Sequence, residues 1–396
     1  MKGTLVRTRF FLLLVVVATM VMGHTPVAAQ TSDDLQAFEK PQQAAVTGET
    51  SRYVVEFNER ADLSDAFAIE DHAARGQLVM ERLESTATAS QAAVLQRINS
   101  TKGASGQGFW LRNVVVFEGD QALADAVAAM SGVREVRREK TYQIARPVRV
   151  QQAEPAEGAE WGVEKIGAPA AWDEGIFGSG IVVGSLDSGI DFLHPALVDK
   201  YRGNYGDGTF THDYNWFDAS GDCPTDEPCD LLGHGTHTMG TMVGGDGPGP
   251  FSPDIGVAPG AQFMTVSCGP GFCSESQLMA AGQFFIAPTD LNGENPDPAM
   301  RPDVVNNSWG GPPGDPFFVD MVDAWEAAGI IPVFSSGNPG PSCGEGGSPG
   351  DYLSAFSVGA TDIEDDIAEV SGRGPSAFGK INPDVAAPGV HVVDHD

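Results

Sequence analysis

Apolar residues between positions 50 and 145 recur with the periods of short strands and of amphipathic helices. The pattern predicts a strand, a long helix, a second strand, a shorter helix and a charged strand, at residues 52–57, 64–98, 109–117, 121–130 and 133–144. Gly76 and the serines between positions 85 and 90 could interrupt the long helix. Strands and helices in this order predict a small α+β domain.

A different pattern begins at Trp161, where continuous apolar strands alternate with helices. The strands are expected at residues 181–187, 263–267, 303–309, 330–335, 353–360 and 385–387, and two of the helices at residues 274–286 and 317–328. Strands that are apolar throughout are buried on both faces, so the pattern predicts an α/β fold with a mostly parallel, doubly wound sheet. Functional sites in such sheets lie at the carboxyl ends of the strands.

Two segments are expected to lie outside these domains. Residues 1–29 combine three early basic residues, an apolar run at 10–23 and a small-residue end at Val27–Ala29. That run is too short to cross a membrane, so it predicts a secretory signal peptide and a secreted protein, extracellular or periplasmic. Residues 146–160 are rich in Pro, Gln and Glu without an apolar period, and they predict a linker.

The net charge of −31 is confined to the second half of the chain. Residues 1–150 carry 17 basic and 17 acidic side chains, whereas residues 151–396 carry 6 basic and 37 acidic ones. Such a surface repels polyanions, which argues against nucleic acid and anionic membranes as partners. High solubility accounts for the charge, and structural calcium held by some of the aspartates is the alternative.

Five cysteines in an exported protein predict disulfide bonds with one thiol left over. Cys223 and Cys229 flank an acidic loop, and Cys268 and Cys273 flank a Gly-Pro-Gly turn, so these pairs are the expected bridges. Cys343 would then be unpaired. Metal binding is the weaker interpretation, because neither pair has a histidine at ligand spacing.

Two segments carry residue types suited to catalysis. Residues 233–245 read G-H-G-T-H-T-M-G-T-M-V-G-G and predict a helix that opens on His234, while Asp187 ends the apolar strand at 181–187. An aspartate at a strand end and a histidine at a helix start are two members of an Asp-His-Ser triad. Taken alone, a glycine-flanked histidine is more often structural.

Two further segments follow strands of the expected sheet. Residues 304–311 read V-V-N-N-S-W-G-G, and residues 331–340 read I-P-V-F-S-S-G-N-P-G. Each is also consistent with a buried strand that ends in a glycine turn, since an asparagine after glycine, such as Asn338, is usually a turn residue.

Together and in this order, the four segments resemble the subtilisin family of serine peptidases. The resemblance extends to the start at Trp161 and to G-K-I-N-P-D-V-A-A-P-G-V at residues 379–390. It implies that His234 is the general base, that Asp187 orients it, and that Asn338 donates to the oxyanion. Residues of the substrate-binding edge would be Ser308, Trp309 and Gly310.

The same resemblance implies a domain order and a set of partners. Residues 50–145 would be an inhibitory propeptide with a ferredoxin-like fold, and residues 161–396 the peptidase domain. Peptides or proteins would be the substrates, the propeptide would be an intramolecular partner, and no cofactor would be required apart from the calcium considered above.

The catalytic serine of the family does not appear in this sequence. It belongs in a G-T-S-M-A segment, but none of the Gly-Thr pairs at 3–4, 208–209, 235–236 and 240–241 is followed by serine. The sequence therefore predicts a peptidase chain that is truncated before its nucleophile and is inactive alone. The alternative is a non-catalytic pseudo-peptidase that binds peptides along residues 308–310.

Overall fold

The computed structural model describes residues 50–144, 159–247 and 254–390, which all belong to one compact unit. The predicted signal peptide and nearly all of the predicted linker lie outside these ranges. Within them, no helix combines the length and the apolar character that crossing a membrane requires.

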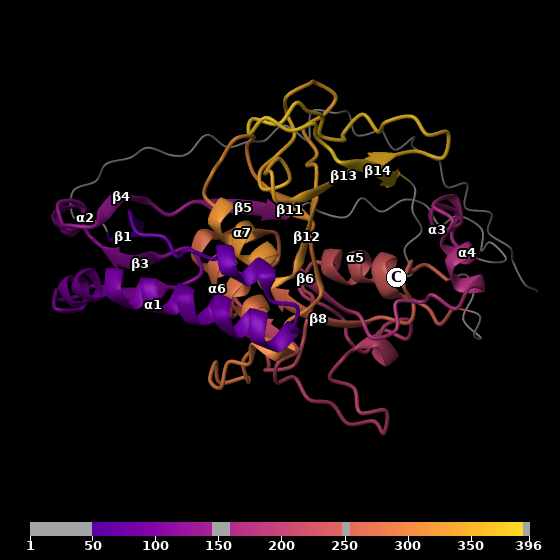
Figure 1. Ribbon diagram of the computed structural model, residues 1–396, viewed down its shortest axis with the longest axis horizontal. Coiled ribbons are helices and arrows are strands. Elements are labelled where there is room, and N and C mark those ends of the chain that lie inside the picture. The colour runs from indigo at the N-terminus through magenta and orange to yellow at the C-terminus, as the bar shows by residue number, and fades with distance from the viewer. Residues whose placement is uncertain (1–49, 145–158, 248–253, 391–396) are drawn as a thin grey trace, which may run out of the picture. The chain divides into compact units, whose positions relative to one another are not determined.

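Residues 50–144, here called the N-terminal region, form a four-stranded antiparallel sheet with two helices (Figure 1). Its elements are β1 (Ser51–Phe57), η2 (Ser64–Ala68), α1 (His72–Asn99), β2 (Ser105–Phe109), β3 (Val114–Gly119), α2 (Gln121–Ala128) and β4 (Val133–Arg138). The strand order β2-β3-β1-β4 gives the β-α-β-β-α-β arrangement of ferredoxin-like domains.

The long helix is shorter at its start than the sequence predicts, and it is not interrupted. Asp71 caps α1 by accepting a hydrogen bond from the backbone N–H of Ala74 at 2.8 Å, so the helix begins at His72. Its polar middle stays helical, and there the hydroxyls of Thr86 and Ser90 donate to carbonyls one turn earlier.

The strand predicted at residues 109–117 is only partly right: residues 114–117 lie in β3, but residues 110–113 make a tight turn between β2 and β3. Asn113 adopts a φ of 54° in that turn, a conformation that asparagine tolerates better than most residues. The buried side-chain amide of Gln91 donates to the carbonyl of Phe109 at 2.9 Å and to Asn113 Oδ1 at 3.1 Å. These contacts anchor the turn on α1.

The charged strand predicted at residues 133–144 is also divided. β4 ends at Arg138, and β5 (Thr141–Ile144) joins another sheet, where it lies antiparallel between β11 (Trp309–Gly310) and β9 (Phe272–Ser274). The chain changes sheets at Glu139 and Lys140, which bond to the first turn of α6 (Glu275–Ile286).

The second half of the chain is built on a seven-stranded sheet in which every neighbouring pair is parallel. In spatial order its strands are β14 (Val385–Pro388), β13 (Phe356–Thr361), β12 (Ile331–Ser335), β10 (Val304–Asn307), β6 (Val182–Asp187), β8 (Gln262–Ser267) and β7 (Trp216–Asp218). This confirms the predicted α/β class.

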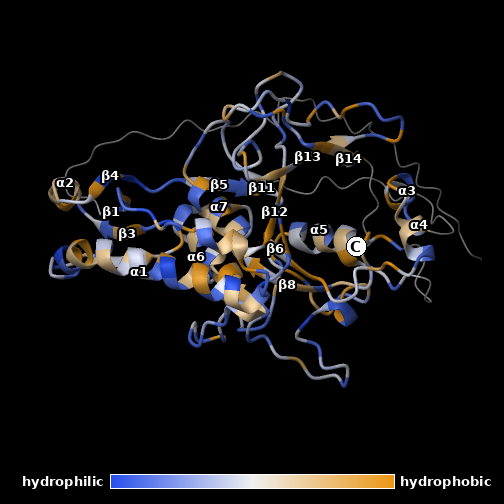
Figure 2. Cartoon of the chain, in the orientation of Figure 1, coloured by the Kyte–Doolittle hydropathy of each residue, from blue (hydrophilic) through white to orange (hydrophobic). Residues whose placement is uncertain are grey.

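Helices cover both faces of this sheet, and adjacent residues of β8 show it. Phe263 packs with Met239 and Val243 of α5 (His234–Val243), whereas Met264 belongs to the cluster that contains α6 and α7 (Val319–Ala328). Successive side chains of a strand point to opposite faces, so the two clusters are the two sides of the sheet. Figure 2 shows the hydrophobic colour of β6, β8 and β12 between these helices. Two short helices, α3 (Trp161–Lys165) and α4 (Ala168–Asp173), precede β6.

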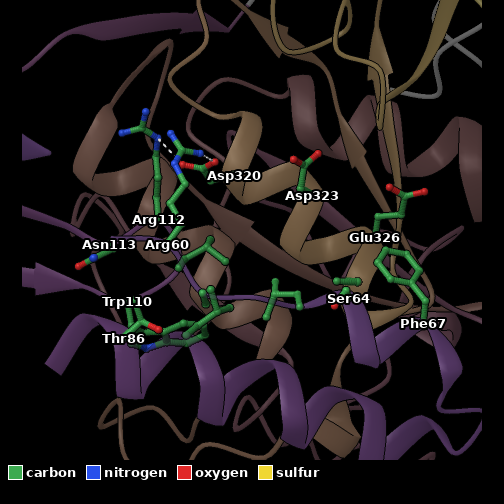
Figure 3. Close-up of a pocket in the computed structure, with 15 residues that line it drawn as sticks. Arg60, Ser64, Phe67, Thr86, Trp110, Arg112, Asn113, Asp320, Asp323 and Glu326 are labelled. Carbon is green, nitrogen blue, oxygen red and sulfur yellow. Dashed lines mark ion pairs between the residues drawn. The ribbon is translucent and has the colours of Figure 1, made fainter. Parts of the chain in front are cut away.

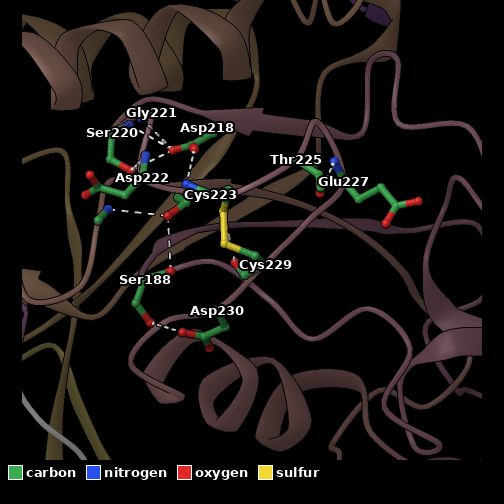
Figure 4. The surroundings of a disulfide bond; sticks show 12 residues. Ser188, Asp218, Ser220, Gly221, Asp222, Cys223, Thr225, Glu227, Cys229 and Asp230 are labelled. Carbon is green, nitrogen blue, oxygen red and sulfur yellow. Dashed lines mark hydrogen bonds between the residues drawn. A yellow bond between two sulfur atoms is a disulfide. The ribbon is translucent and has the colours of Figure 1, made fainter.

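Both predicted disulfide bonds form, between Cys223 and Cys229 and between Cys268 and Cys273. Cys343 is an exposed free thiol, as expected. The first bridge closes a loop that is also held by the carboxylate of Asp218, which accepts hydrogen bonds from the backbone N–H groups of Ser220, Gly221 and Cys223 (Figure 4).

Basic groups of the N-terminal region meet acidic groups of the second half of the chain. The guanidinium of Arg137 binds both carboxylate oxygens of Glu275 at 2.8 Å, and Glu275 is fully buried. Glu139 accepts from the backbone N–H of Ser276 at 2.8 Å, which places an anion at the N-terminus of α6. The bidentate pair of Arg137 and Glu275 is planar, so it fixes the orientation of the two side chains as well as their distance.

We predict that Arg137→Ala lowers the free energy of unfolding by about 3–5 kcal/mol, because it leaves the Glu275 carboxylate buried without its partner. Urea unfolding of the purified chain measures this. The neighbouring exposed Arg138 is the matched control, and its replacement by alanine should change stability by less than about 0.5 kcal/mol. Equal effects of the two substitutions would contradict the prediction.

Candidate active site

Asp187 and His234 form the centre of the candidate site. Asp187 is the last residue of β6 and is fully buried, and His234 is the first residue of α5 and nearly so. His234 Nδ1 and Asp187 Oδ1 lie 2.7 Å apart, and the hydroxyl of Thr238 is 3.4 Å from Asp187 Oδ2. The structure thus brings together the two residues that the sequence predicts as base and orienting acid.

The start of α5 is fixed by two side chains rather than by an N-cap of its own. Ser188 Oγ accepts from the backbone N–H of Gly235 at 2.9 Å and donates to Asp230 Oδ1 at 2.8 Å (Figure 4). Asp230 Oδ2 accepts from the backbone N–H of Thr236 at 2.8 Å and from its hydroxyl at 2.7 Å. These contacts satisfy N–H groups that a helix start leaves unpaired.

Glycines in the segment after β6 and at the start of α5 allow the backbones of these two segments to touch. A Cβ at Gly235 would lie 2.1 Å from the carbonyl oxygen of Gly189, and a Cβ at Gly189 would lie 1.9 Å from that of Cys229. Gly233 serves differently: its φ of +85° lets the chain turn into the helix, and no atom lies within 4 Å of its place for a Cβ.

The charge state of His234 is set by opposing influences. Burial by itself lowers the pKa of the imidazole, but the hydrogen bond to Asp187 and the charges of Asp187 and Asp230 raise it, and the net result lies above 6.5. Burial likewise opposes ionisation of Asp230, yet the hydrogen bonds from Thr236, Gly233 and Ser188 hold the pKa of that carboxyl below its usual value.

This geometry suits proton transfer at one ring nitrogen. Asp187 occupies Nδ1, so it fixes the tautomer and leaves Nε2 to exchange a proton with a reacting group. A charged imidazolium would be stabilised by the same carboxylate. The pair can therefore act as the base and its orienting acid in nucleophilic catalysis.

The other predicted residues follow neighbouring strands of the sheet. In the parallel register, Asn307 of β10 lies beside Leu186 of β6 and Phe334 of β12, so Ser308 leaves the sheet at the same edge as Asp187. Asn338 follows β12 and has an exposed side chain in the loop there. Asn338 therefore lies at the sheet edge where the site is predicted, but no hydrogen bond or ion pair joins it to His234 in the described part of the chain.

Trp309 and Gly310 bind an extended segment, and Ser308 directly precedes them. Trp309 pairs with Ile144 and Gly310 with Gln143, while the other side of β5 pairs with β9. The N–H of Ile144 donates to the carbonyl of Gly271 at 3.0 Å. β5 therefore lies as the central strand of a three-stranded antiparallel sheet.

Sequence reasoning missed two parts of this site. β9 has only three residues and no apolar period, and the Gly-Pro-Gly turn before it was the available signal. Asp230 precedes Gly-His-Gly-Thr in the sequence, and an aspartate shortly before a helix start is a capping signal that could have identified it.

A cavity of about 420 Å³ lies elsewhere, between the N-terminal region and α7 (Figure 3). Asp320 in its wall forms ion pairs with Arg60 and Arg112. None of the predicted site residues lines this cavity, so we assign it no part in catalysis.

Comparison with known proteins finds several bacterial proteins that are similar in sequence to this chain. Bacillopeptidase F of Bacillus subtilis (strain 168) is 38% identical over 335 residues, which cover 79% of this chain and 23% of that protein. Serine protease AprX and Subtilisin E of the same organism are each 30% identical, over 54% and 60% of this chain and over 48% and 54% of their own lengths. The chain thus spans between about a quarter and about half of these relatives.

A sequence profile described as "Subtilase family" matches residues 178–396, which is more than half of the chain. The matched range contains Asp187, His234, Asn338 and the edge at residues 308–310. Together with the parallel α/β sheet, this match shows that the chain belongs to the subtilase family.

Proposed function

We propose that this protein is the precursor of an exported serine endopeptidase, which hydrolyses peptide bonds with an Asp-His-Ser triad. The observation that carries the proposal is the 2.7 Å contact of His234 with the buried Asp187, beside an edge that already binds an extended strand. Family membership supports protease function with protein substrates.

In the proposed reaction, His234 takes the proton of a serine hydroxyl and returns it to the leaving amine, while Asp187 stabilises the imidazolium. Asn338 donates its amide hydrogen bond to the oxyanion. This reaction requires a serine nucleophile, and the G-T-S-M-A segment that carries it in the family does not occur in this sequence.

We further propose that residues 50–145 are an inhibitory propeptide. β5 hydrogen-bonds to β11 and β9 as an added substrate strand would, so it competes with substrate for the same edge. The Arg137–Glu275 pair supports this role, because it holds the N-terminal region against α6.

A non-catalytic peptide-binding protein is the second candidate, since the edge at residues 308–310 would serve it equally well. The Asp187–His234 pair favours catalysis, because a peptide binder needs no base with an orienting carboxylate.

Export after removal of residues 1–29 belongs to the same proposal, and the sequence pattern of that segment supports it. One relative is named "Minor extracellular protease Vpr", at 32% identity over 50% of this chain.

Structural calcium stays a prediction: within the ranges that the structure describes, no three His, Cys, Asp or Glu side chains are placed to hold a metal ion. A rise in melting temperature on adding CaCl₂, reversed by EGTA, would support it.

The proposed reaction predicts that activity appears only when a serine is supplied. Residues 30–396 should be expressed with and without the serine-bearing C-terminal segment of a close relative, and casein hydrolysis measured. We expect hydrolysis only from the extended protein, and a loss of about 10⁶-fold in turnover on His234→Ala. An extended protein that folds but cleaves no peptide would count against catalysis and favour the peptide binder.

The pKa of His234 gives a prediction for the chain as it stands. An NMR titration should place this pKa above 6.5, and Asp187→Asn should lower it, because burial then acts without the compensating charge. Since the folded pKa is raised, the stability contributed by the pair is complete below about pH 6.5 and is lost as pH rises through the folded value. An unchanged pKa in Asp187→Asn would contradict the assigned contact.

The same raised pKa sets the acidic limb of activity in the serine-bearing protein. Only neutral imidazole accepts a proton, so kcat/KM should rise with pH through a midpoint above 6.5. A midpoint well below that value would assign the base to another group.

A further inference from the structure

Tyr142 of β5 fills a narrow slot beneath β11. The side chain is almost fully buried, and its ring packs edge-on against Trp309 and Phe318, with centroid distances of 6.0 and 5.0 Å. Gly311 closes the slot, because a Cβ there would lie 2.7 Å from a carbon of the Tyr142 ring. The slot therefore has the width of one aromatic ring.

A carboxylate lies at the end of this slot. The Tyr142 hydroxyl donates to Asp315 Oδ2 at 3.0 Å, and the ammonium of Lys140 binds the same oxygen at 2.8 Å. Asp315 Oδ1 accepts from the backbone N–H of Phe317 at 3.1 Å. Burial opposes ionisation, but Lys140 and the hydrogen bonds hold the pKa of Asp315 below its usual range, so with the N-terminal region in place this group is an acceptor.

Asp315 is held in place by groups outside the N-terminal region. Its backbone N–H donates to Ser348 Oγ at 3.0 Å, and its carbonyl accepts from the hydroxyl of Tyr352. Ser348 in turn donates to the buried Asp351 at 2.7 Å, which also accepts from the N–H of Gly314. These contacts all lie within residues 314–352, so they do not depend on β5.

The position of Tyr142 is one that a substrate would occupy. Tyr142 pairs with Cys273 of β9, and the next residue, Gln143, pairs with Gly310 of β11. A peptide bound in the same register would place one side chain in the slot. This step rests on the proposed function, in which β5 and substrate share the edge.

We propose that Asp315 makes this slot selective for tyrosine, because it accepts a hydrogen bond from the phenolic hydroxyl of a substrate residue at the position of Tyr142. Phenylalanine would meet the same ring walls but would leave Asp315 Oδ2 without that donor. Sites built to bind a hydroxyl reject the analogue that lacks it. Because the Asp315 side chain is 10% exposed, water can replace the missing hydroxyl, so we expect a preference of about tenfold rather than several thousandfold.

The first test uses the serine-bearing protein described above. Peptide pairs that differ only by tyrosine or phenylalanine at one position at a time are compared by kcat/KM. We expect a preference for tyrosine of about tenfold at a single position, a smaller one in Asp315→Asn, and none or a reversed one in Asp315→Leu. Gly311→Ala is the matched control, since it narrows the slot and should weaken both peptides while keeping their ratio.

Hydrolysis without a tyrosine preference, or a preference that survives Asp315→Leu, would overturn the inference while leaving the proposed function intact. Absence of any hydrolysis would mean that the proposed function fails, and the substrate role of the slot would fail with it.

The second test uses the chain as it stands and needs no catalysis. Tyr142→Ala empties the slot, and p-cresol and toluene then reproduce the side chains of tyrosine and phenylalanine. We expect p-cresol to raise the melting temperature more than toluene, and the order to reverse when Asp315→Leu is added. No shift with either compound, or an equal shift with both, would show that Asp315 does not select the hydroxyl.

Discussion

Because β6, β10 and β12 run parallel in one register, the segments that follow them leave the sheet at a common edge. Asp187 ends the first of these strands, Ser308 follows the second, and the loop with Asn338 follows the third. The active-site candidates thus come from distant parts of the sequence but owe their proximity to backbone hydrogen bonds in the core. Loss of that register would separate the base from the peptide-binding edge even if each local motif kept its conformation.

The sequence predicted the parts of the structure that local patterns determine. Asp187 ends a continuous apolar strand and His234 opens a helix after a glycine turn, so both positions followed from short-range signals. The sheet class followed from strands that are apolar on both faces. The segment at 133–144 failed for the opposite reason: its alternating residues continue past Arg138, but contacts with α6 move Thr141–Ile144 into another sheet.

Long-range pairing explains what sequence reasoning could not reach. Arg137 and Glu275 lie 138 positions apart, and Tyr142 and Asp315 lie 173 apart, so no periodicity or motif connects them. Each of these carboxylates resembles any other acidic side chain in a half that carries a large negative charge. Their roles become visible only when β5 is placed on its two neighbouring strands, because that placement selects which acids face the N-terminal region.

The contact of Gly189 with Gly235 has a mechanical consequence. The carbonyl of Gly189 already fills the space beside the Gly235 Cα, so α5 cannot move closer to the end of β6. Movement of α5 away from β6 would lengthen the hydrogen bonds that join Ser188 to Gly235 and to Asp230. The start of α5 and the end of β6 therefore move together as one rigid unit. A force applied to the imidazole would be transmitted to β6, an interior strand of the sheet, and thermal motion would displace His234 and Asp187 together.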